Sequence, residues 1–149
     1  MENVQQAKRL REMMRLLARK LGFLERGEAS CCRITLSQCY AIVEVGRVGK
    51  VSLIDLADNL NLDKSTVSRS IDNLVNQEII IREPDPEDRR FVMLRLTEHG
   101  ESIYKEIERR MEAYFLEIIG TIPADKREQV IESVHCLTEA IHGSGSGCC

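Results

Sequence analysis

A short stretch near the middle of the chain carries small hydroxyls and one arginine at helical spacing. In residues 64–77 the apolar side chains of Val67, Ile71 and Leu74 recur at steps of four and three, which predicts the buried face of a helix. Hydroxyls, an amide and a guanidinium on the other face could bond base edges or phosphates in a DNA groove. The polar residues outside the apolar stripe or at its boundary are Ser65, Thr66, Ser68, Arg69 and Asn73.

The residues before this segment predict a shorter helix joined to it by a tight turn. Ser52 and Asp55 have the spacing of a capping box that opens a helix. Asn61-Leu62-Asp63 forms the turn, and Asp63 is expected to cap the second helix. Two short helices with a polar outer face on the second are typical of a helix-turn-helix that reads DNA.

A predicted β-hairpin, or wing, follows directly. Ile79–Arg82 and Phe91–Leu96 are β-type runs, and Pro84 and Pro86 predict that residues 83–90 form a loop. An arginine-tipped wing beside a helix-turn-helix strengthens the interpretation as a DNA-binding unit.

Two arginines, Arg89 and Arg90, follow Asp88 near the tip of this wing. The position of the wing favours contact with DNA for at least one of them. The alternative is a solvated turn in which they pair with Asp85, Glu87 or Asp88.

Amphipathic helices are predicted on both sides of this unit. Leucines and methionine at steps of four and three predict a helix over residues 3–25, followed by a loop at 26–30. Thr35 is expected to open a helix whose buried stripe is Leu36, Cys39, Tyr40 and Val43 and which ends at Gly46 and Gly49. Thr97 is expected to cap a helix over residues 98–119, and Pro123 suits the first turn of a last helix.

We therefore expect a mainly α fold with a small β-wing, in which a winged helix-turn-helix joins a helical dimerisation region built from the N- and C-terminal helices. The apolar stripes of the first and last helices exceed what the small central unit can cover, which predicts a symmetric homodimer. The predicted parts are an N-terminal dimerisation helix (1–30), the winged helix-turn-helix (31–97), the C-terminal dimerisation helices (98–142) and a flexible Gly/Ser/Cys tail (143–149).

The net charge of −3 is unevenly distributed along the chain. Residues 1–97 carry 16 Lys and Arg against 14 Asp and Glu, whereas residues 98–149 carry 5 against 10. A weakly basic first part implies few phosphate contacts per subunit, so two subunits would share the binding. No apolar run approaches the roughly 20 residues that cross a membrane, and no secretory signal is visible, so we expect a cytoplasmic protein without a membrane partner.

Patterns typical of enzymes are missing from the sequence. It contains no phosphate-binding glycine loop, no nucleophile elbow and no HExxH zinc motif. His99, His135 and His142 lack the spacing of a metal site. We expect no enzymatic activity and no required cofactor.

The six cysteines suggest a second kind of chemistry. Cys31 and Cys32 are adjacent to Arg33, which should lower at least one thiol pKa, and Cys148 and Cys149 end the chain after a Gly/Ser stem. Thiolates suit soft metal or metalloid ions, and oxidation is the rival reaction. The alternative is that these cysteines are incidental and the tail is a disordered end.

The order of these motifs resembles the MarR family of winged helix-turn-helix transcriptional regulators over residues 5–142, most specifically in LADNLNLDKSTVSRSIDNLVNQ and REPDPEDRRFVMLRLTEHG. The resemblance implies a homodimer on a pseudo-palindromic operator in double-stranded DNA, usually a repressor. A small effector (a metal or metalloid, an oxidant or an organic ligand) would act at the junction between the dimerisation helices and the winged unit.

The resemblance also implies roles for individual residues. Ser65, Thr66, Ser68 and Arg69 fall on the family's major-groove helix. Asp88, Arg89 and Arg90 match its wing-tip motif, in which one arginine enters the minor groove and the aspartate orients an arginine; both arginines remain candidates. The rival function is a winged-helix module that binds protein, or a thiol-rich metal-binding protein, without operator binding.

Overall fold

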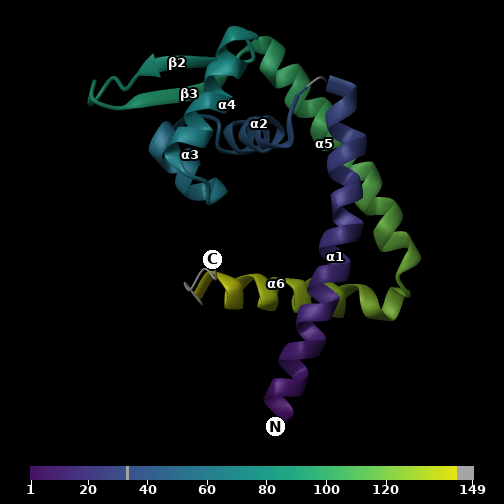
Figure 1. Cartoon of the computed structure of the whole chain (residues 1–149). Coiled ribbons are helices and arrows are strands. Elements are labelled where there is room, and N and C mark those ends of the chain that lie inside the picture. Colours follow the sequence, from purple (N-terminus) through teal and green to yellow (C-terminus); the bar gives the residue numbers. More distant parts are fainter. Residues whose placement is uncertain (33, 144–149) are drawn as a thin grey trace. The chain divides into compact units, whose positions relative to one another are not determined.

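The computed structural model describes the backbone of residues 1–32 and 34–143, and the side chains of residues 1–21 and 34–141. The chain divides into two units, Met1–Ile107 and Glu108–Cys149. Its elements, in chain order (Figure 1), are α1 (Glu2–Cys32), α2 (Leu36–Val48), β1 (Val51–Ser52), α3 (Leu53–Leu60), α4 (Lys64–Asn76), β2 (Ile80–Pro84), β3 (Val92–Leu96), α5 (Glu98–Thr121), the short 3₁₀ helix η1 (Ala124–Lys126) and α6 (Arg127–Gly143). The predicted fold class is confirmed.

Side-chain caps begin the helices of the winged unit where the sequence predicted them. Thr35 and Gln38 form a capping box at α2, with the Thr35 N–H donating to Gln38 Oε1 at 2.9 Å and the Gln38 N–H to Thr35 Oγ1 at 3.3 Å. Ser52 accepts the Asp55 N–H at the start of α3, and Asp63 accepts the Thr66 N–H at the start of α4. These bonds satisfy backbone donors that a helix leaves unpaired in its first turn.

The core of the first unit lies between α2, α3, α4 and the sheet. The predicted inner face of α4 is confirmed, because Val67, Ile71 and Leu74 are all buried. The largest fully buried side chains are Ile42, Val45, Leu56, Val67, Ile71, Leu74, Ile80 and Leu94.

The predicted buried stripe of α2 is wrong. Tyr40 is half exposed, and Leu36, Cys39 and Val43 are only partly buried. The side chains of α2 that face the core are Gln38, Ala41, Ile42 and Val45. Both sets have helical spacing, so periodicity alone could not choose between two neighbouring faces of this apolar helix.

Two expected interruptions of the helices are also wrong. The backbone remains helical through residues 26–30, where a loop was predicted, because a single Gly27 costs a helix only about 1 kcal/mol. Gly46 lies inside α2 rather than at its end, and the ring of Tyr104 lies so close that an added Cβ would be 2.6 Å from it. Gly49, at φ 90°, ends the helix as predicted.

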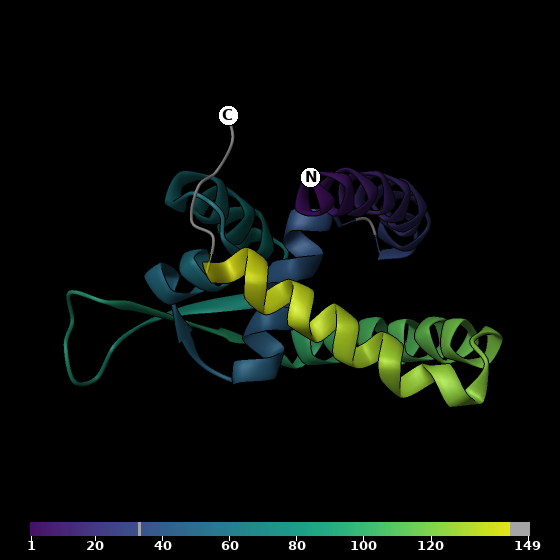
Figure 2. The ribbon, with the colours of Figure 1, turned by 90° about the horizontal axis from the view of Figure 1, so that it is seen from below.

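The wing is an antiparallel hairpin that both views show extending beyond the helices (Figures 1 and 2). The strand order is β1-β3-β2, and Ile80 pairs with Leu96 while Pro84 pairs with Val92. The prediction that residues 83–90 are all loop is therefore wrong for the first two of them. Proline is tolerated there because β2 is an edge strand. The short β1 was not predicted.

The second unit contains the end of α5, then η1 and α6. Pro123 precedes η1 rather than opening α6, which corrects its predicted place. None of the helices in the described part of the chain is long and apolar enough to span a bilayer.

Hydrogen bonds link the start of α5 to the junction between α4 and β2. Thr97 Oγ1 accepts the Gly100 N–H at 2.9 Å, which confirms Thr97 as the cap, and donates to the Glu78 carbonyl oxygen at 2.6 Å. The Thr97 N–H donates to the Ile79 carbonyl oxygen at 3.0 Å. Gly100 is buried against the same carbonyl, and a Cβ at Gly100 would lie 2.1 Å from its oxygen.

This contact predicts opposite outcomes for two glycines of α5. Gly100→Ala forces the helix away from the Ile79 carbonyl and should lower the free energy of unfolding by about 1–3 kcal/mol. Gly120→Ala meets nothing within 4 Å and should be neutral or stabilising by up to about 1 kcal/mol. Urea unfolding at one protein concentration measures both variants. Equal effects at the two positions would contradict the close packing at Gly100.

Candidate nucleic-acid interface

The first turn of α4 is organised by the Asp63 carboxylate. Asp63 accepts the Thr66 N–H at 3.0 Å and hydrogen bonds from the hydroxyls of Ser65 and Thr66. The Ser65 hydroxyl is the largest cause that holds the pKa of the Asp63 carboxyl well below its usual range, followed by the bonds from Thr66. Ser65 and Asp63 are exposed, and Thr66 is partly buried. The hydroxyls at the start of the helix are thus already bonded within the protein.

The next turns of α4 present unbonded polar groups. Arg69 and Asn73 are exposed and Ser68 is partly exposed, as predicted from the apolar stripe. The side chain of Arg69 forms no hydrogen bond or ion pair with the side chains that the structure describes. All five guanidinium donors of Arg69 therefore remain available for a partner.

A polar cleft of about 300 Å³ lies between the first turn of α2 and the outer face of α4. Its lining residues carry hydroxyls, amides and one guanidinium, and none carries a carboxylate. The N-terminus of α2 adds backbone N–H groups that attract an anion. The lining residues are Thr35, Ser37, Gln38, Thr66, Arg69, Ser70 and Asn73.

Four of these residues were missed as site candidates: Thr35, Ser37, Gln38 and Ser70. Thr35 was identified in the sequence only as a helix cap. Nothing in the local pattern showed that the start of α2 lies beside α4, because that neighbourhood depends on tertiary packing.

At the wing tip, Asp88 forms an ion pair with Arg90 and not with Arg89. Arg90 donates to the Asp88 carboxylate from Nε at 3.0 Å and from Nη2 at 2.8 Å, and the Arg90 backbone N–H donates to the same group at 3.1 Å. The bond with Arg90 lowers the pKa of Asp88. Arg89 has no ion pair with a described side chain. The alternative of pairing with a neighbouring carboxylate is therefore observed for Arg90 and not for Arg89.

Basic residues on the stem of the wing are neutralised by acidic ones. Arg82 pairs with Asp72 of α4. Arg95 lies 2.9 Å and Lys50 3.8 Å from the carboxylate of Glu83. Positive charge without a described partner therefore lies at α4 and the wing tip rather than along the strands.

Lys64 connects these two regions. It opens α4 and lines a cleft of about 130 Å³ together with Ser52 at the start of α3 and Arg90 and Phe91 of the wing. Lys64 was not among the predicted site residues, because a lone lysine at a helix start has no distinctive pattern. The structure thus joins the helix and the wing tip into one basic and polar surface.

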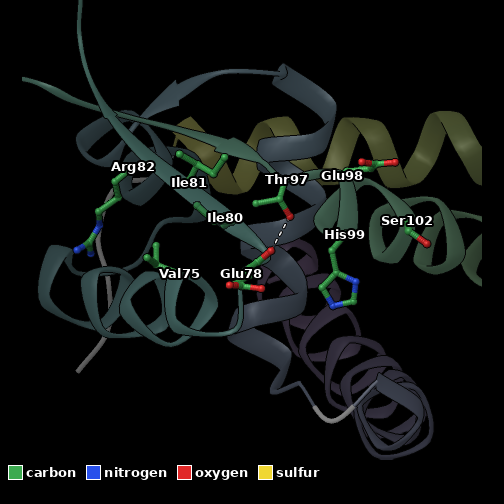
Figure 3. Close-up of a pocket in the computed structure, with 9 residues that line it drawn as sticks. All are labelled: Val75, Glu78, Ile80, Ile81, Arg82, Thr97, Glu98, His99 and Ser102. Atoms are coloured by element: carbon green, nitrogen blue, oxygen red, sulfur yellow. Dashed lines mark hydrogen bonds between the residues drawn. The ribbon is translucent and has the colours of Figure 1, made fainter.

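A separate, more apolar hollow of about 920 Å³ lies at the opposite end of α4, beside β2 and the start of α5 (Figure 3). Figure 3 shows the Thr97 hydroxyl directed to the Glu78 carbonyl, as in the helix junction described above. The side chains that line this hollow include both acidic and basic groups. The lining residues are Val75, Glu78, Ile80, Ile81, Arg82, Thr97, Glu98, His99 and Ser102.

The predicted thiol site is not described by the structure. The side chains of Cys31 and Cys32, and the residues Cys148 and Cys149, lie outside the described part of the chain. Within that part, no group of three or more His, Cys, Asp or Glu side chains could hold a metal ion.

The strand order and the capped helix pair define a winged helix-turn-helix, and comparison with known proteins shows which family it resembles. Residues 34–90 match the sequence model of the MarR family. The chain is 24% identical over 103 residues to the uncharacterized HTH-type transcriptional regulator YdgJ of Bacillus subtilis (strain 168), which covers 69% of this chain and 63% of that relative. The match thus spans less than two thirds of the relative's length.

Solved structures share the fold over nearly the whole chain. The crystal structure of Streptococcus pneumoniae FabT in complex with DNA has a TM-score of 0.83 at 21% identity and covers 92% of this chain and 98% of that one. A mutant MarR from E. coli complexed with operator DNA has a TM-score of 0.73 at 20% identity, with coverage of 91% and 95%. These findings confirm the resemblance to the MarR family and its winged-helix fold.

Proposed function

We propose that this protein is a DNA-binding transcriptional regulator that contacts duplex DNA through α4 and the tip of its wing. Two observations carry the proposal. The guanidinium of Arg69 is exposed on α4 and has no described partner, and one cleft joins Lys64 at the start of α4 to Arg90 of the wing tip. Two relatives of the same fold, FabT and MarR, are seen in complex with DNA, which supports the proposal.

The two regions suit different grooves. An exposed helix fits the major groove, where Arg69 would bond guanine or phosphate. The cleft between α2 and α4 would hold a backbone phosphate, since it offers donors without carboxylates. At the wing, the hydrogen bonds that Arg90 donates to Asp88 fix the direction of the Arg90 side chain. This makes Arg90 our choice for the minor groove and Asp88 its positioning residue. Arg89 would contact the phosphates that flank this minor groove.

A homodimer would complete the binding unit. In α1, side chains that are 38–60% exposed form an apolar face that nothing described covers: Val4, Leu10, Met13, Leu16, Leu17 and Leu21. In α6, a second such face is formed by Val130, Ile131 and Val134. Burial of these faces between two copies removes apolar surface from water. A two-fold dimer would place its two α4 helices about one turn of DNA apart, on the two halves of a pseudo-palindromic operator.

Regulation would follow if an effector changes the spacing between the two α4 helices. An effector releases DNA only if it binds better to the arrangement that fits DNA poorly. We propose a repressor of this kind. The junction at Thr97 would transmit a movement of α5 to α4. Thr97 donates to the carbonyl groups of Glu78 and Ile79, and these two residues donate their N–H groups to Val75 and Leu74 of α4.

Alanine substitutions test the DNA-binding surface. Arg69→Ala and Arg90→Ala should each weaken binding to a selected operator by about tenfold or more, because each removes a charged contact. Arg47→Ala is the matched control, since Arg47 pairs with Glu44 at the far end of α2 and should bind normally. Electrophoretic shift or fluorescence anisotropy measures affinity. Unchanged binding by both variants would favour a winged helix that contacts protein instead.

Sedimentation tests the dimer. The wild-type chain of 17.0 kDa should sediment at twice that mass at micromolar concentration. Leu17→Glu places a charge in the apolar face of α1 and should shift the population to single chains, whereas Val48→Glu, at an exposed position of α2, should leave the dimer intact. A wild-type protein that sediments as single chains would contradict the proposal.

The identity of the effector is a proposal from sequence alone. We propose a thiol-reactive species, either a soft metal or metalloid ion or an oxidant, acting on Cys31 and Cys32 with Cys148 and Cys149. As(III), Hg(II), Cu(I) or peroxide should release DNA from the wild type and not from Cys31→Ser/Cys32→Ser. If none of the four changes the affinity of the wild type, the thiol proposal is wrong and an organic ligand takes its place.

A further inference from the structure

The hollow of about 920 Å³ beside β2 has the size of a small-molecule site. Its walls come from the end of α4, from β2 and from the start of α5 (Figure 3). Sites that bind drug-sized molecules typically enclose about 300–1,000 Å³. No cysteine and no residue of α1, α2 or α6 lines this hollow. It is therefore separate from the surface proposed to contact DNA and from the cysteines proposed to sense an effector.

Part of the lining of this hollow is apolar and reachable from solvent. Val75 of α4 and Ile81 of β2 both line it, and both are only partly buried. The hydroxyl of Ser102, at an exposed position of α5, adds a polar group to the same lining. A ligand with an apolar body that covers Val75 and Ile81 would remove apolar surface from water.

The charged side chains of the hollow leave it negative. Glu78 and Glu98 line it, and neither side chain has a hydrogen bond or ion pair with the side chains that the structure describes. Arg82 is the only lysine or arginine of the lining, and its guanidinium is paired with Asp72. Figure 3 also shows Arg82 directed away from Glu78 and His99. An anion in the hollow would therefore meet two carboxylates and no unpaired lysine or arginine of the lining.

The helix ends beside the hollow do not reverse this charge. The end of α4 contributes the partial negative charge of a helix C-terminus. The start of α5 contributes a partial positive charge, but the first turn of α5 contains Glu98 and Glu101, which offset it.

The backbone of Glu78 is a second observation that points to this place. Glu78 follows the C-cap of α4 at φ 58°, in the left-handed region. Glycine is the usual residue at such a helix end, because it adopts this conformation without a steric cost. The Glu78 carboxylate makes no described contact that would explain a glutamate here. Unfavourable backbone conformations of this kind are frequent at ligand sites.

We propose that this hollow binds a small organic cation with an apolar body. Its positive charge lies beside Glu78, with Glu98 adding to the negative field, and its apolar part lies against Val75 and Ile81. The site goes beyond the proposed function, because it requires neither DNA nor the cysteines. Its ligand would sit where α4, β2 and α5 meet.

Two ions of the same shape and opposite charge test the proposal. Tetraphenylphosphonium and tetraphenylborate both carry four phenyl groups, so they differ mainly in the sign of their charge. Isothermal titration of the full chain in sodium buffer measures both affinities. Tetraphenylphosphonium should bind at least about tenfold more tightly, because the carboxylates attract it and repel the borate. Equal affinities, or no binding of the cation by folded wild-type protein, would overturn the proposal.

Charge-neutralising variants test the role of the carboxylates. Glu78→Gln keeps the shape of the side chain and should weaken binding of tetraphenylphosphonium by on the order of fivefold. Glu78→Gln/Glu98→Gln should bind the two ions with less than about a threefold difference. Glu108→Gln is the matched control, since Glu108 is exposed on the same helix as Glu98 and does not line the hollow. The same loss in Glu108→Gln as in Glu78→Gln would show a general charge effect and overturn the site.

A bulky side chain tests the location. Ser102→Trp starts from an exposed position and should block the hollow, so binding of tetraphenylphosphonium should fall by about tenfold or more. Ser133→Trp, at an exposed position of α6, should bind as the wild type does. Urea unfolding checks that both variants are folded. Unchanged binding by folded Ser102→Trp would place the cation elsewhere and overturn the proposal.

The site and the proposed function can fail separately. The titrations contain no DNA, so a protein without operator binding would still bind the cation in the predicted way. Conversely, loss of the preference for the cation would leave the effects of Arg69→Ala and Arg90→Ala on DNA binding unchanged.

Discussion

The burial of one face of α4 is the constraint on which the rest of this molecule depends. Val67, Ile71 and Leu74 are each no more than 2% exposed, so the rotation of the helix about its axis is fixed by the core. A helix turned by one residue would move about 100° and exchange its polar and apolar faces. Packing therefore decides that Arg69 and Asn73 face solvent, and the same core positions the wing through Leu94 of β3.

Ion pairs within the protein then determine which charged side chains of this surface remain available to a partner. The chain is acidic overall, yet its described acidic residues neutralise the stem of the wing and leave Lys64, Arg69 and Arg89 without a described partner. Two carboxylates act on the proposed interface itself. Asp88 accepts hydrogen bonds from Arg90, and Asp63 accepts hydrogen bonds from the hydroxyls of Ser65 and Thr66. In both places an aspartate determines which hydrogen-bond donors of a neighbouring side chain remain available to a partner. The acidic residues therefore belong to the description of the interface as much as the basic ones.

Local sequence signals predicted much of this arrangement. The caps at Thr35, Ser52 and Asp63 were predictable because each depends on two residues three apart. The face of α4 was predictable because its polar and apolar residues are sharply divided. The buried face of α2 was not, since apolar residues occur on two of its faces and only contact with α4 selects one. The bond between Asp88 and Arg90, the place of Lys64 and the cleft beside α2 depend on tertiary neighbours that no spacing reveals.

The central claim is that two copies of α4 and its wing contact one DNA duplex. Hydroxyl-radical and methylation footprinting of the wild-type protein on its selected operator tests that claim most directly. We expect two major-groove protections about one helical turn apart, each with a minor-groove protection at its outer side from the wing. A single unpaired protection, or protected major grooves with no flanking minor-groove signal, would contradict it.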